Sequence, residues 1–392
     1  MDLMLRGKSV IDSRRGLAIA SRDAATRFLA SYGYNLENPV EAAELLGNYQ
    51  EALQFIRKYF LKPEAQEGAE LEIPKMFFEV SDVRDLFVWA GDKSLLHEDV
   101  FRMRWACAVL RVMHTISHID KDLRHDYFSS IQQQVFDRFY KELHNVDGKL
   151  FLGDPRGDGI ELVKFQTKPR KARDSLVIKL LHKAENVAEE VFDQVGVRFV
   201  TKTAVDTVRV LMFLNERNIV MPMNLRPSRS RNNLVDPLVY RRTWRVAKRE
   251  AKGGILHSRA EVDGLMERAL ESAAQPALPE SRAHNPFSNA SYRSIQFTCR
   301  QLIKFRNPAY EQLKALRSAL KGAGDPAVKA AVEQIDISKL TREQRFFYPF
   351  EVQIVDHKNH LEAESGQASH AAYKAAQQQM AMKRVLGQLL DP

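Results

Sequence analysis

Cysteine is scarce in this sequence. Its two examples, Cys107 and Cys299, are too few for a disulfide framework or a zinc cluster. No apolar run approaches the roughly 18 residues that a membrane-spanning helix needs. The first residues carry charges throughout and lack the apolar centre of a secretory signal. We therefore expect a cytoplasmic protein that makes no contact with a membrane.

Acidic residues are outnumbered by basic ones, 50 against 59, so the net charge is 59 − 50 = +9. Such an excess favours polyanionic partners such as nucleotides or RNA, although an excess that only aids solubility explains it equally well. The length of 392 residues and the hydrophobic fraction of 44% suffice for two domains, each with a core.

The first part of the chain, residues 1–150, has the apolar spacing of helices and is predicted to form a helical domain of unknown role. The segments with this spacing are Asp23 to Tyr32, Pro39 to Phe60 and His97 to Leu123. In the third segment His114, His118 and Asp122 recur at four-residue intervals, a pattern that can bind a metal. Because no neighbour completes a site, a solvated or hydrogen-bonded face is the default interpretation.

Residues 151–159 are rich in Gly, Asp and Pro and predict a boundary before a second domain, residues 151–392. A strand over Ile160 to Gln166 precedes a basic run and a helix that carries Ser175 and Lys179. Basic groups beside a helix N-terminus suit a triphosphate. A solvated basic face is the alternative.

A further strand is expected at Val195 to Val200, directly after Asp193. Asp193 has two interpretations. It is either a turn or capping residue, or one half of a Mg²⁺ site together with Glu351, since carboxylate oxygens suit that ion.

Two insertions are predicted, at about 222–286 and 308–345. The first holds a polar loop (PMNLRPSRSRNN), a cationic amphipathic stretch (LVYRRTWRVAKREAKGG) and a helix that opens with the capping-box pair Ser258 and Glu261. The basic stretch fits RNA phosphates, a substrate or solvent equally. The second insertion is helical, and a strand from about Tyr292 to Phe305 separates the two.

The stretch Phe350 to Ile354 alternates apolar and polar side chains, so Glu351 and Gln353 lie on the face opposite Phe350, Val352 and Ile354. Taken alone, this pattern is typical of an edge strand or of a site. His360 and Glu364 follow at helical spacing and share one helix face.

This C-terminal stretch resembles the synthetase domain of the RelA/SpoT family. The residues that match the family pattern are Glu351, Gln353, Ile354, His360, Ala363, Glu364, Gly366, Ala368, His370, Tyr373 and Lys374. Three weaker matches occur upstream in the family's order. They are Lys171, Ser175 and Lys179; then Asp193, Gly196 and Arg198; then the segment 289–296 with Tyr292.

The resemblance implies an α+β fold, with a nucleotidyltransferase-like mixed sheet after the helical domain. It implies transfer of pyrophosphate from ATP to the 3′-hydroxyl of GDP or GTP, which makes the alarmones (p)ppGpp. Asp193 and Glu351 would hold Mg²⁺, and Glu351 would also act as the base. Lys171, Ser175, Lys179 and Arg198 would bind ATP, Tyr292 would stack on guanine, and Gln353, His360 and Glu364 would line the acceptor pocket.

Five positions depart from the family pattern: Val355-Asp356 replace Arg-Thr, Gln296 replaces His, Ser291 replaces Gly, and Pro169 replaces Arg. Because of these departures, three acceptors remain possible: GDP or GTP, an adenine nucleotide, and the 3′ end of a tRNA. A degenerate domain that binds nucleotide or RNA and regulates a partner is a further alternative, and a homo-oligomer also stays open. His125-Asp126 lack the acidic residues of the family's hydrolase site, so no alarmone hydrolysis is expected.

Overall fold

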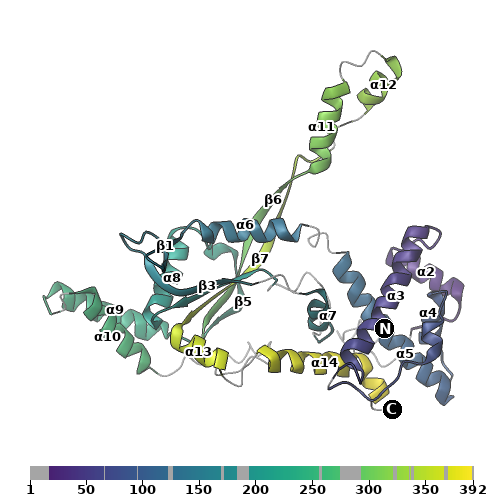
Figure 1. The fold of residues 1–392 in the computed structure, drawn as a ribbon, viewed down its shortest axis with the longest axis horizontal. Helices are drawn as coiled ribbons and strands as arrows, with labels where there is room; N and C mark the ends of the chain where they lie inside the picture. Colours follow the sequence, from purple (N-terminus) through teal and green to yellow (C-terminus); the bar gives the residue numbers. More distant parts are fainter. Residues whose placement is uncertain are drawn as a thin grey trace.

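A computed structural model describes residues 17–65, 67–94, 96–121, 127–168, 172–182, 194–255, 258–273, 293–320, 325–334, 336, 340–365 and 370–390. Within these ranges the chain forms one seven-stranded mixed sheet with helices packed on it, and a group of helices to one side of the sheet (Figure 1). The predicted α+β class is therefore confirmed.

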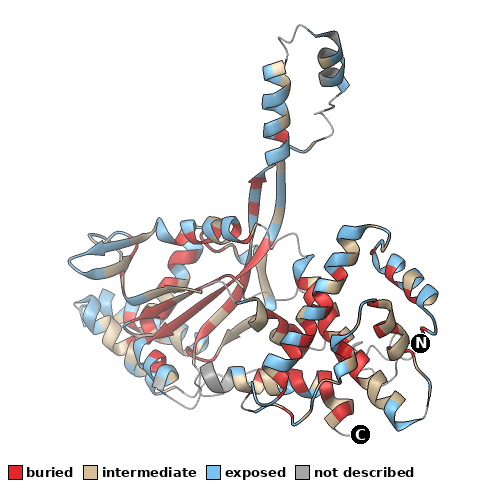
Figure 2. Cartoon of the chain, turned by 45° about the vertical axis from the view of Figure 1, so that its right-hand side comes forward, coloured by how far each residue is buried: buried red, intermediate tan, exposed pale blue. Residues whose placement is uncertain are grey.

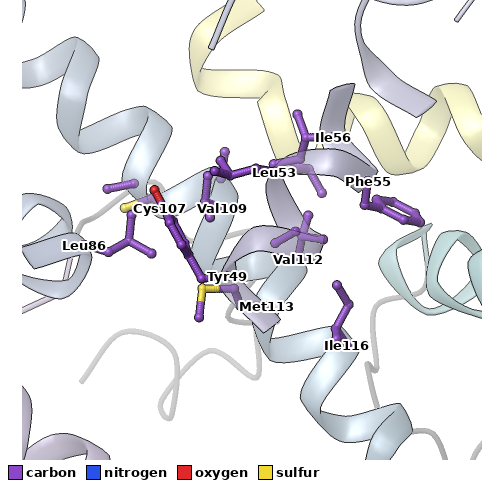
Figure 3. Packing of buried hydrophobic residues seen from close by; sticks show 14 of the residues in the cluster. Tyr49, Leu53, Phe55, Ile56, Leu86, Cys107, Val109, Val112, Met113 and Ile116 are labelled. Carbon is purple, nitrogen blue, oxygen red and sulfur yellow. The ribbon is translucent and has the colours of Figure 1, made fainter. Parts of the chain in front are cut away.

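Three of the N-terminal helices lie where the apolar spacing predicts them: α2 (Arg22–Tyr32), α3 (Pro39–Phe60) and α5 (His97–Asp120). The 3₁₀ turn η2 (Lys75–Phe78) and α4 (Arg84–Ala90) were not predicted. Ser21 and Asn38 cap α2 and α3, because each side chain accepts a hydrogen bond from a backbone N–H of the first turn. Figure 3 shows Tyr49, Leu53 and Ile56 of α3 packed against Val109 and Val112 of α5.

Two helices from later in the sequence complete this helical core. α7 (Arg173–His182) packs against α14 (His370–Leu390) and α5, and α14 also contacts α3. Their buried apolar residues, among them Leu180 and Leu386, belong to the same hydrophobic cluster as the N-terminal helices. The C-terminal part of the chain therefore returns to the N-terminal helices.

The sheet has the strand order β1-β2-β3-β4-β7-β6-β5. The strands are β1 (Leu143–Val146), β2 (Lys149–Leu152), β3 (Ile160–Thr167), β4 (Gly196–Thr201), β5 (Leu225–Asn232), β6 (Ile295–Arg306) and β7 (Glu343–Asp356). Among the strand pairs of the described residues, β4–β7 is the parallel one and the others are antiparallel. The predicted strands at 160–166, 195–200 and 350–354 are thereby confirmed.

One face of the sheet is covered by helices and forms the second hydrophobic core. α6 (Phe128–Tyr140), α8 (Ala204–Glu216) and α10 (Arg259–Glu271) supply its helical side. The strands contribute their alternate apolar residues, including Phe199, Phe297 and Phe350. Alternation along each strand is what directs these side chains to a single face.

The first insertion contains the 3₁₀ turn η4 (Pro222–Asn224), strand β5, and helices α9 (Pro237–Lys252) and α10. The capping box predicted at Ser258 and Glu261 is present at the start of α10. The loop predicted over PMNLRPSRSRNN was wrong, because Leu225–Asn232 pairs with β6. An edge strand with a proline and a register shift needs few apolar residues, so its sequence lacks the usual alternation.

The second insertion is helical, as predicted, and stands away from the rest of the molecule (Figure 1). Beyond Cys299 and Phe350, β6 and β7 pair only with each other and lead to α11 (Pro308–Leu320) and α12 (Pro326–Gln334). Figure 2 shows this arm as mostly exposed. At the base of this arm the Gln134 side chain of α6 donates to the Lys304 carbonyl and accepts from the Lys304 backbone N–H. The Gln301 side chain of β6 donates to the Gln134 backbone carbonyl.

The boundary predicted near residue 150 separates the cores only partly, and the two-domain division stays a prediction. α6 precedes that position and packs on the sheet, whereas α7 and α14 follow it and pack with the N-terminal helices.

Among the described helices, none is long and apolar enough to cross a membrane.

Candidate functional site

The face of the sheet opposite α6 and α8 carries two rows of polar side chains that run across the strands. In the first row Gln166, Arg198, Gln353, Gln296 and Arg231 are successive partners on β3, β4, β7, β6 and β5. Paired residues of neighbouring strands point to the same face, about 4.8 Å apart. Five strands thus place five hydrogen-bonding groups side by side.

The second row contains the carboxylate of the site. Glu351 pairs with Gly196 of β4 and with Thr298 of β6, and Thr298 pairs with Arg226 of β5. Beyond Gly196, Lys168 follows β3 and donates its backbone N–H to the Gly196 carbonyl at 2.8 Å. Basic side chains therefore stand at both ends of the row, with one carboxylate between them.

The Glu351 carboxylate is buried, with a side-chain exposure of 6%. Lys168 Nζ donates to its Oε2, and Gln296 Nε2 donates to its Oε1. A buried charge is tolerated when it is paired and hydrogen-bonded. Both oxygens of the predicted base thus have partners from other strands.

Gly196 gives Lys168 its path to Glu351. A Cβ atom at position 196 would lie 2.9 Å from Lys168 Cδ and 3.2 Å from the Glu351 carbonyl oxygen. The Lys168 chain therefore crosses β4 where a side chain is missing, and glycine is the residue that permits so close an approach.

Arg198 and Gln353 form the second joined pair of the predicted site. Arg198 Nε donates to Gln353 Oε1 at 3.0 Å, between neighbouring parallel strands. Gln353 is buried, while Arg198 is half-buried. The guanidinium is held beside Gln353, two positions along β7 from Glu351, and its other N–H groups can donate to an anion.

His360 and Glu364 lie on α13 (His357–Ser365), which packs against β7 and β4. His360 Nε2 is 3.3 Å from Glu364 Oε1, and the imidazole is buried while the carboxylate is largely exposed. Burial lowers the pKa of His360. Glu364 opposes that effect, whereas Arg198, Lys164 and His357 add to it. His360 therefore lies within the electrostatic reach of the basic groups of the polar face and favours the neutral form.

The two residues that depart from the family pattern after Ile354 have structural roles. Val355 pairs with Val200, and both are fully buried next to α13. Asp356 Oδ1 accepts the backbone N–H of Asn359 at 2.8 Å and so caps α13. Apart from an Asp at the end of a strand, no pattern in the sequence predicted this cap.

Ser175 and Lys179 lie on α7, which packs mainly against α14 and α5 rather than on the sheet. The start of α7 is tied to the N-terminal helices. Arg173 pairs with Asp120 at 2.6 Å, and Asp174 accepts from the Tyr59 hydroxyl at 2.5 Å. These two predicted residues therefore stand beside the helical core and outside the two polar rows.

Three predicted site residues, Lys171, Asp193 and Tyr292, lie outside the described residues. So do Gly366 and Ala368 of the C-terminal motif, while Lys374 is exposed on α14. The described part of the predicted site consists of Glu351, Gln353, Arg198, His360 and Glu364, with Ser175 and Lys179 apart on α7.

A Mg²⁺ ion fits the donor type that this site offers. The buried Glu351 carboxylate is a hard oxygen ligand of the kind Mg²⁺ prefers. Among the described residues no group of three or more His, Cys, Asp or Glu side chains could enclose an ion. Mg²⁺ commonly binds through one or two carboxylates and substrate phosphates, so a single described ligand is compatible with it.

The histidines of α5 form a cluster with a tyrosine. The Tyr32 hydroxyl lies 2.6 Å from His114 Nδ1 and 3.4 Å from His118 Nε2. Burial, reinforced by His118, lowers the pKa of His114 to about 4. Asp122, His125 and Asp126 are outside the described residues. A hydrogen-bonded face, the default interpretation, accounts for the two described histidines.

Sequence reasoning missed Lys168 and Gln296 as partners of Glu351. A signal was available for Lys168, because Lys164, Gln166 and Lys168 continue the period-two polar series of β3. For Gln296 the sequence contained no such signal, apart from its place in the alternation of polar and apolar residues of β6. Together with Arg198 these residues can bind phosphate next to a carboxylate that accepts protons or holds a cation.

No model of a known protein family matches this sequence, and no curated protein matches it.

Proposed function

We propose that this protein is a Mg²⁺-dependent pyrophosphokinase of the RelA/SpoT type, with a nucleotidyltransferase-like sheet. It transfers pyrophosphate from ATP to the 3′-hydroxyl of GDP or GTP. The observation that carries the proposal is the buried Glu351 on an otherwise basic polar face, between Lys168 and Gln296. Phosphoryl transfer needs positive groups for the phosphates and a carboxylate beside them.

In the proposed reaction the 3′-hydroxyl oxygen of the acceptor attacks the β-phosphorus of ATP. The bond from that phosphorus to the α–β bridging oxygen breaks, and AMP leaves. The hydroxyl proton passes to the Glu351 carboxylate, which requires Lys168 to move from Oε2 toward the substrate phosphates. Lys168 and Arg198 then neutralise the phosphate oxygens.

Glu351 would hold Mg²⁺ together with Asp193, the role that the resemblance gives this pair. When bound, the ion reduces charge repulsion at the transferred phosphates. Lys171, Ser175 and Lys179 would add contacts to ATP, and Tyr292 would stack on the acceptor base. His360 and Glu364 would border the acceptor beside Gln353.

A second candidate function is nucleotide binding without transfer. This alternative is favoured because both oxygens of Glu351 already accept hydrogen bonds, one from Lys168 and one from Gln296. The Lys168 ammonium thereby neutralises the charge of the carboxylate. In this alternative the basic groups retain a nucleotide while the carboxylate never acts as a base.

Labelled ATP incubated with GDP, GTP, AMP, ADP, ATP or tRNA separates these candidates. Transfer to GDP or GTP supports the proposal, and transfer to an adenine nucleotide or to tRNA keeps the chemistry but changes the acceptor. Absence of transfer to all six, with ATP binding retained by calorimetry, contradicts the enzyme and supports the binding protein.

A further inference from the structure

Helix α9 carries an unusual concentration of positive charge. It contains six basic residues and a single carboxylate, Glu250, so its net charge is 6 − 1 = +5. The net charge of the whole chain is +9. The six are Arg241, Arg242, Arg245, Lys248, Arg249 and Lys252, and all are exposed. Within the part of the chain that the structure describes, none of them has an acidic partner.

These six cations lie on one side of the helix. At about 100° per residue they fall within an arc of about 120°. From Arg241 to Lys252 the row extends for about 16 Å along the axis, at about 1.5 Å per residue. The opposite side contains Val239 and the fully buried Ala247. The helix therefore presents a continuous cationic surface rather than scattered charges.

The cationic surface is held rigidly on the protein. α9 packs against α10, and Glu267 of α10 accepts the backbone N–H groups of Ala204 and Val205 at the start of α8. Asp263 of α10 also pairs with Arg209 of α8 at 2.9 Å. Figure 1 places α9 and α10 at the opposite end of the molecule from α2 to α5. The surface is thus fixed to the sheet core.

Trp244 lies at the border of the cationic surface and is 45% exposed. A large aromatic ring beside positive charges offers a stacking platform for an unpaired base. A duplex hides its bases from such a ring, whereas RNA loops and single strands present them together with their phosphates.

A membrane surface fits this helix less well. A helix that lies on a membrane buries its apolar face among the lipids. Here that face is already packed against α10 and the sheet core, where Val239 and Tyr240 are half-buried and Ala247 is fully buried. The exposed side offers six cations, the Trp244 indole and a single large exposed aliphatic side chain, Leu238. One leucine is too little apolar surface to enter lipid, whereas the charges and the indole match a nucleic acid strand.

We propose that the cationic surface of α9, with Trp244, binds single-stranded RNA. The basic side chains contact phosphates, and the indole stacks on one base. The inference rests on α9 alone and does not depend on the proposed transferase activity, because RNA binding is measured without ATP or acceptor.

The test measures binding of the full chain to a fluorescein-labelled, unstructured RNA of about 20 nucleotides by fluorescence anisotropy, over a range of salt concentrations. Neutralising three cations in R241Q/R245Q/K248Q should weaken binding at least tenfold. It should also lower the slope of log Kd against log salt by about 2, since each phosphate contact on a single strand contributes about 0.7.

A matched control removes the same charge elsewhere. R27Q/K75Q/K93Q alters three exposed cations near the N-terminal helices and leaves α9 intact. It should bind RNA within about twofold of the unaltered chain. Equal weakening by the two triple variants would show a response to net charge alone and would overturn the proposal.

Trp244→Ala should weaken binding about tenfold with an unchanged salt slope, and Trp244→Phe should restore most of the loss. Unchanged affinity in Trp244→Ala would overturn the stacking role. Duplex RNA and anionic phospholipid vesicles are the competing probes. Preference for either over the single strand would overturn the assignment of the partner. Circular dichroism and Tm of each variant verify that α9 remains folded.

Discussion

The two faces of the sheet are built from the same strands and have opposite characters. Phe350, Val352 and Ile354 enter the core under α6 and α8, while Glu351 and Gln353 join the polar rows. From Tyr348 to Asp356 both faces of β7 are buried, yet Phe350, Val352 and Ile354 are apolar, whereas Glu351 and Gln353 are hydrogen-bonded polar groups. Burial on the apolar face stabilises the fold. Burial on the polar face holds functional groups in place, and their hydrogen bonds and ion pairs offset the free-energy cost of removing them from water.

The largest expected effect lies on the polar face. Glu351→Gln should reduce pyrophosphate transfer by about 10³-fold or more, because an amide neither takes a proton nor holds a divalent cation as a carboxylate does. ATP binding should persist. A labelled-ATP transfer assay with calorimetry measures both, and Glu343→Gln, on the exposed part of the same strand, is the matched control. Full activity in Glu351→Gln would exclude Glu351 as base and metal ligand.

The apolar face should respond in stability instead. Phe350→Ala removes a ring that is 1% exposed and should lower the free energy of unfolding by about 3–5 kcal/mol through the cavity it leaves. Phe347→Ala, on the same strand but 51% exposed, should cost less than about 1 kcal/mol. Urea denaturation followed by circular dichroism gives both values. Equal losses would mean that the Phe350 ring is not packed in the apolar core.

Gly196→Ala tests the point where Lys168 crosses the sheet. The added methyl group meets Lys168 and the Glu351 carbonyl, so we expect the free energy of unfolding to fall by about 1–3 kcal/mol. The KM for ATP should rise, because Lys168 is displaced. Gly47→Ala is the control, because nothing lies within 4 Å of its Cβ and alanine favours the interior of α3 by about 0.5–1 kcal/mol. Thermal melts and the KM for ATP measure the difference. A Gly196→Ala protein as stable as Gly47→Ala would contradict the crossing.

The smallest effect concerns His360 and pH. Its folded pKa is lowered, so the unfolded chain takes up the proton first and stability falls as pH drops below about 6.5. One proton limits this slope to about 1.4 kcal/mol per pH unit. His360→Gln should remove that part of the slope in urea titrations between pH 5 and 7.5.

His114 also makes stability fall as pH drops, because burial lowers its pKa to about 4. This contribution is present both in the unaltered chain and in His360→Gln. The quantity to compare is therefore the difference between the unaltered chain and His360→Gln. An identical pH dependence in the two proteins would mean that His360 titrates as in the unfolded chain.

Much of the fold follows from local sequence patterns. The spacing of apolar residues predicted α2, α3 and α5, and the Ser258 and Glu261 pair predicted the start of α10. Alternation in 350–354 assigned Glu351 and Gln353 to one face, and the structure joins them to Arg198 across the strands. β5 was missed because its Arg-rich sequence forms a strand only by pairing with β6.

The sequence by itself determined the strand and helix periods, the capping box of α10 and the chemical types along the polar face, because these depend on neighbours within a few residues. Only the tertiary structure decided that Lys168, 183 positions away, and Gln296, 55 positions away, are the partners of Glu351. It also decided that α7 and α14 pack with the N-terminal helices. Long-range strand pairing and core packing select among many chemically equivalent partners, and no local pattern encodes that choice.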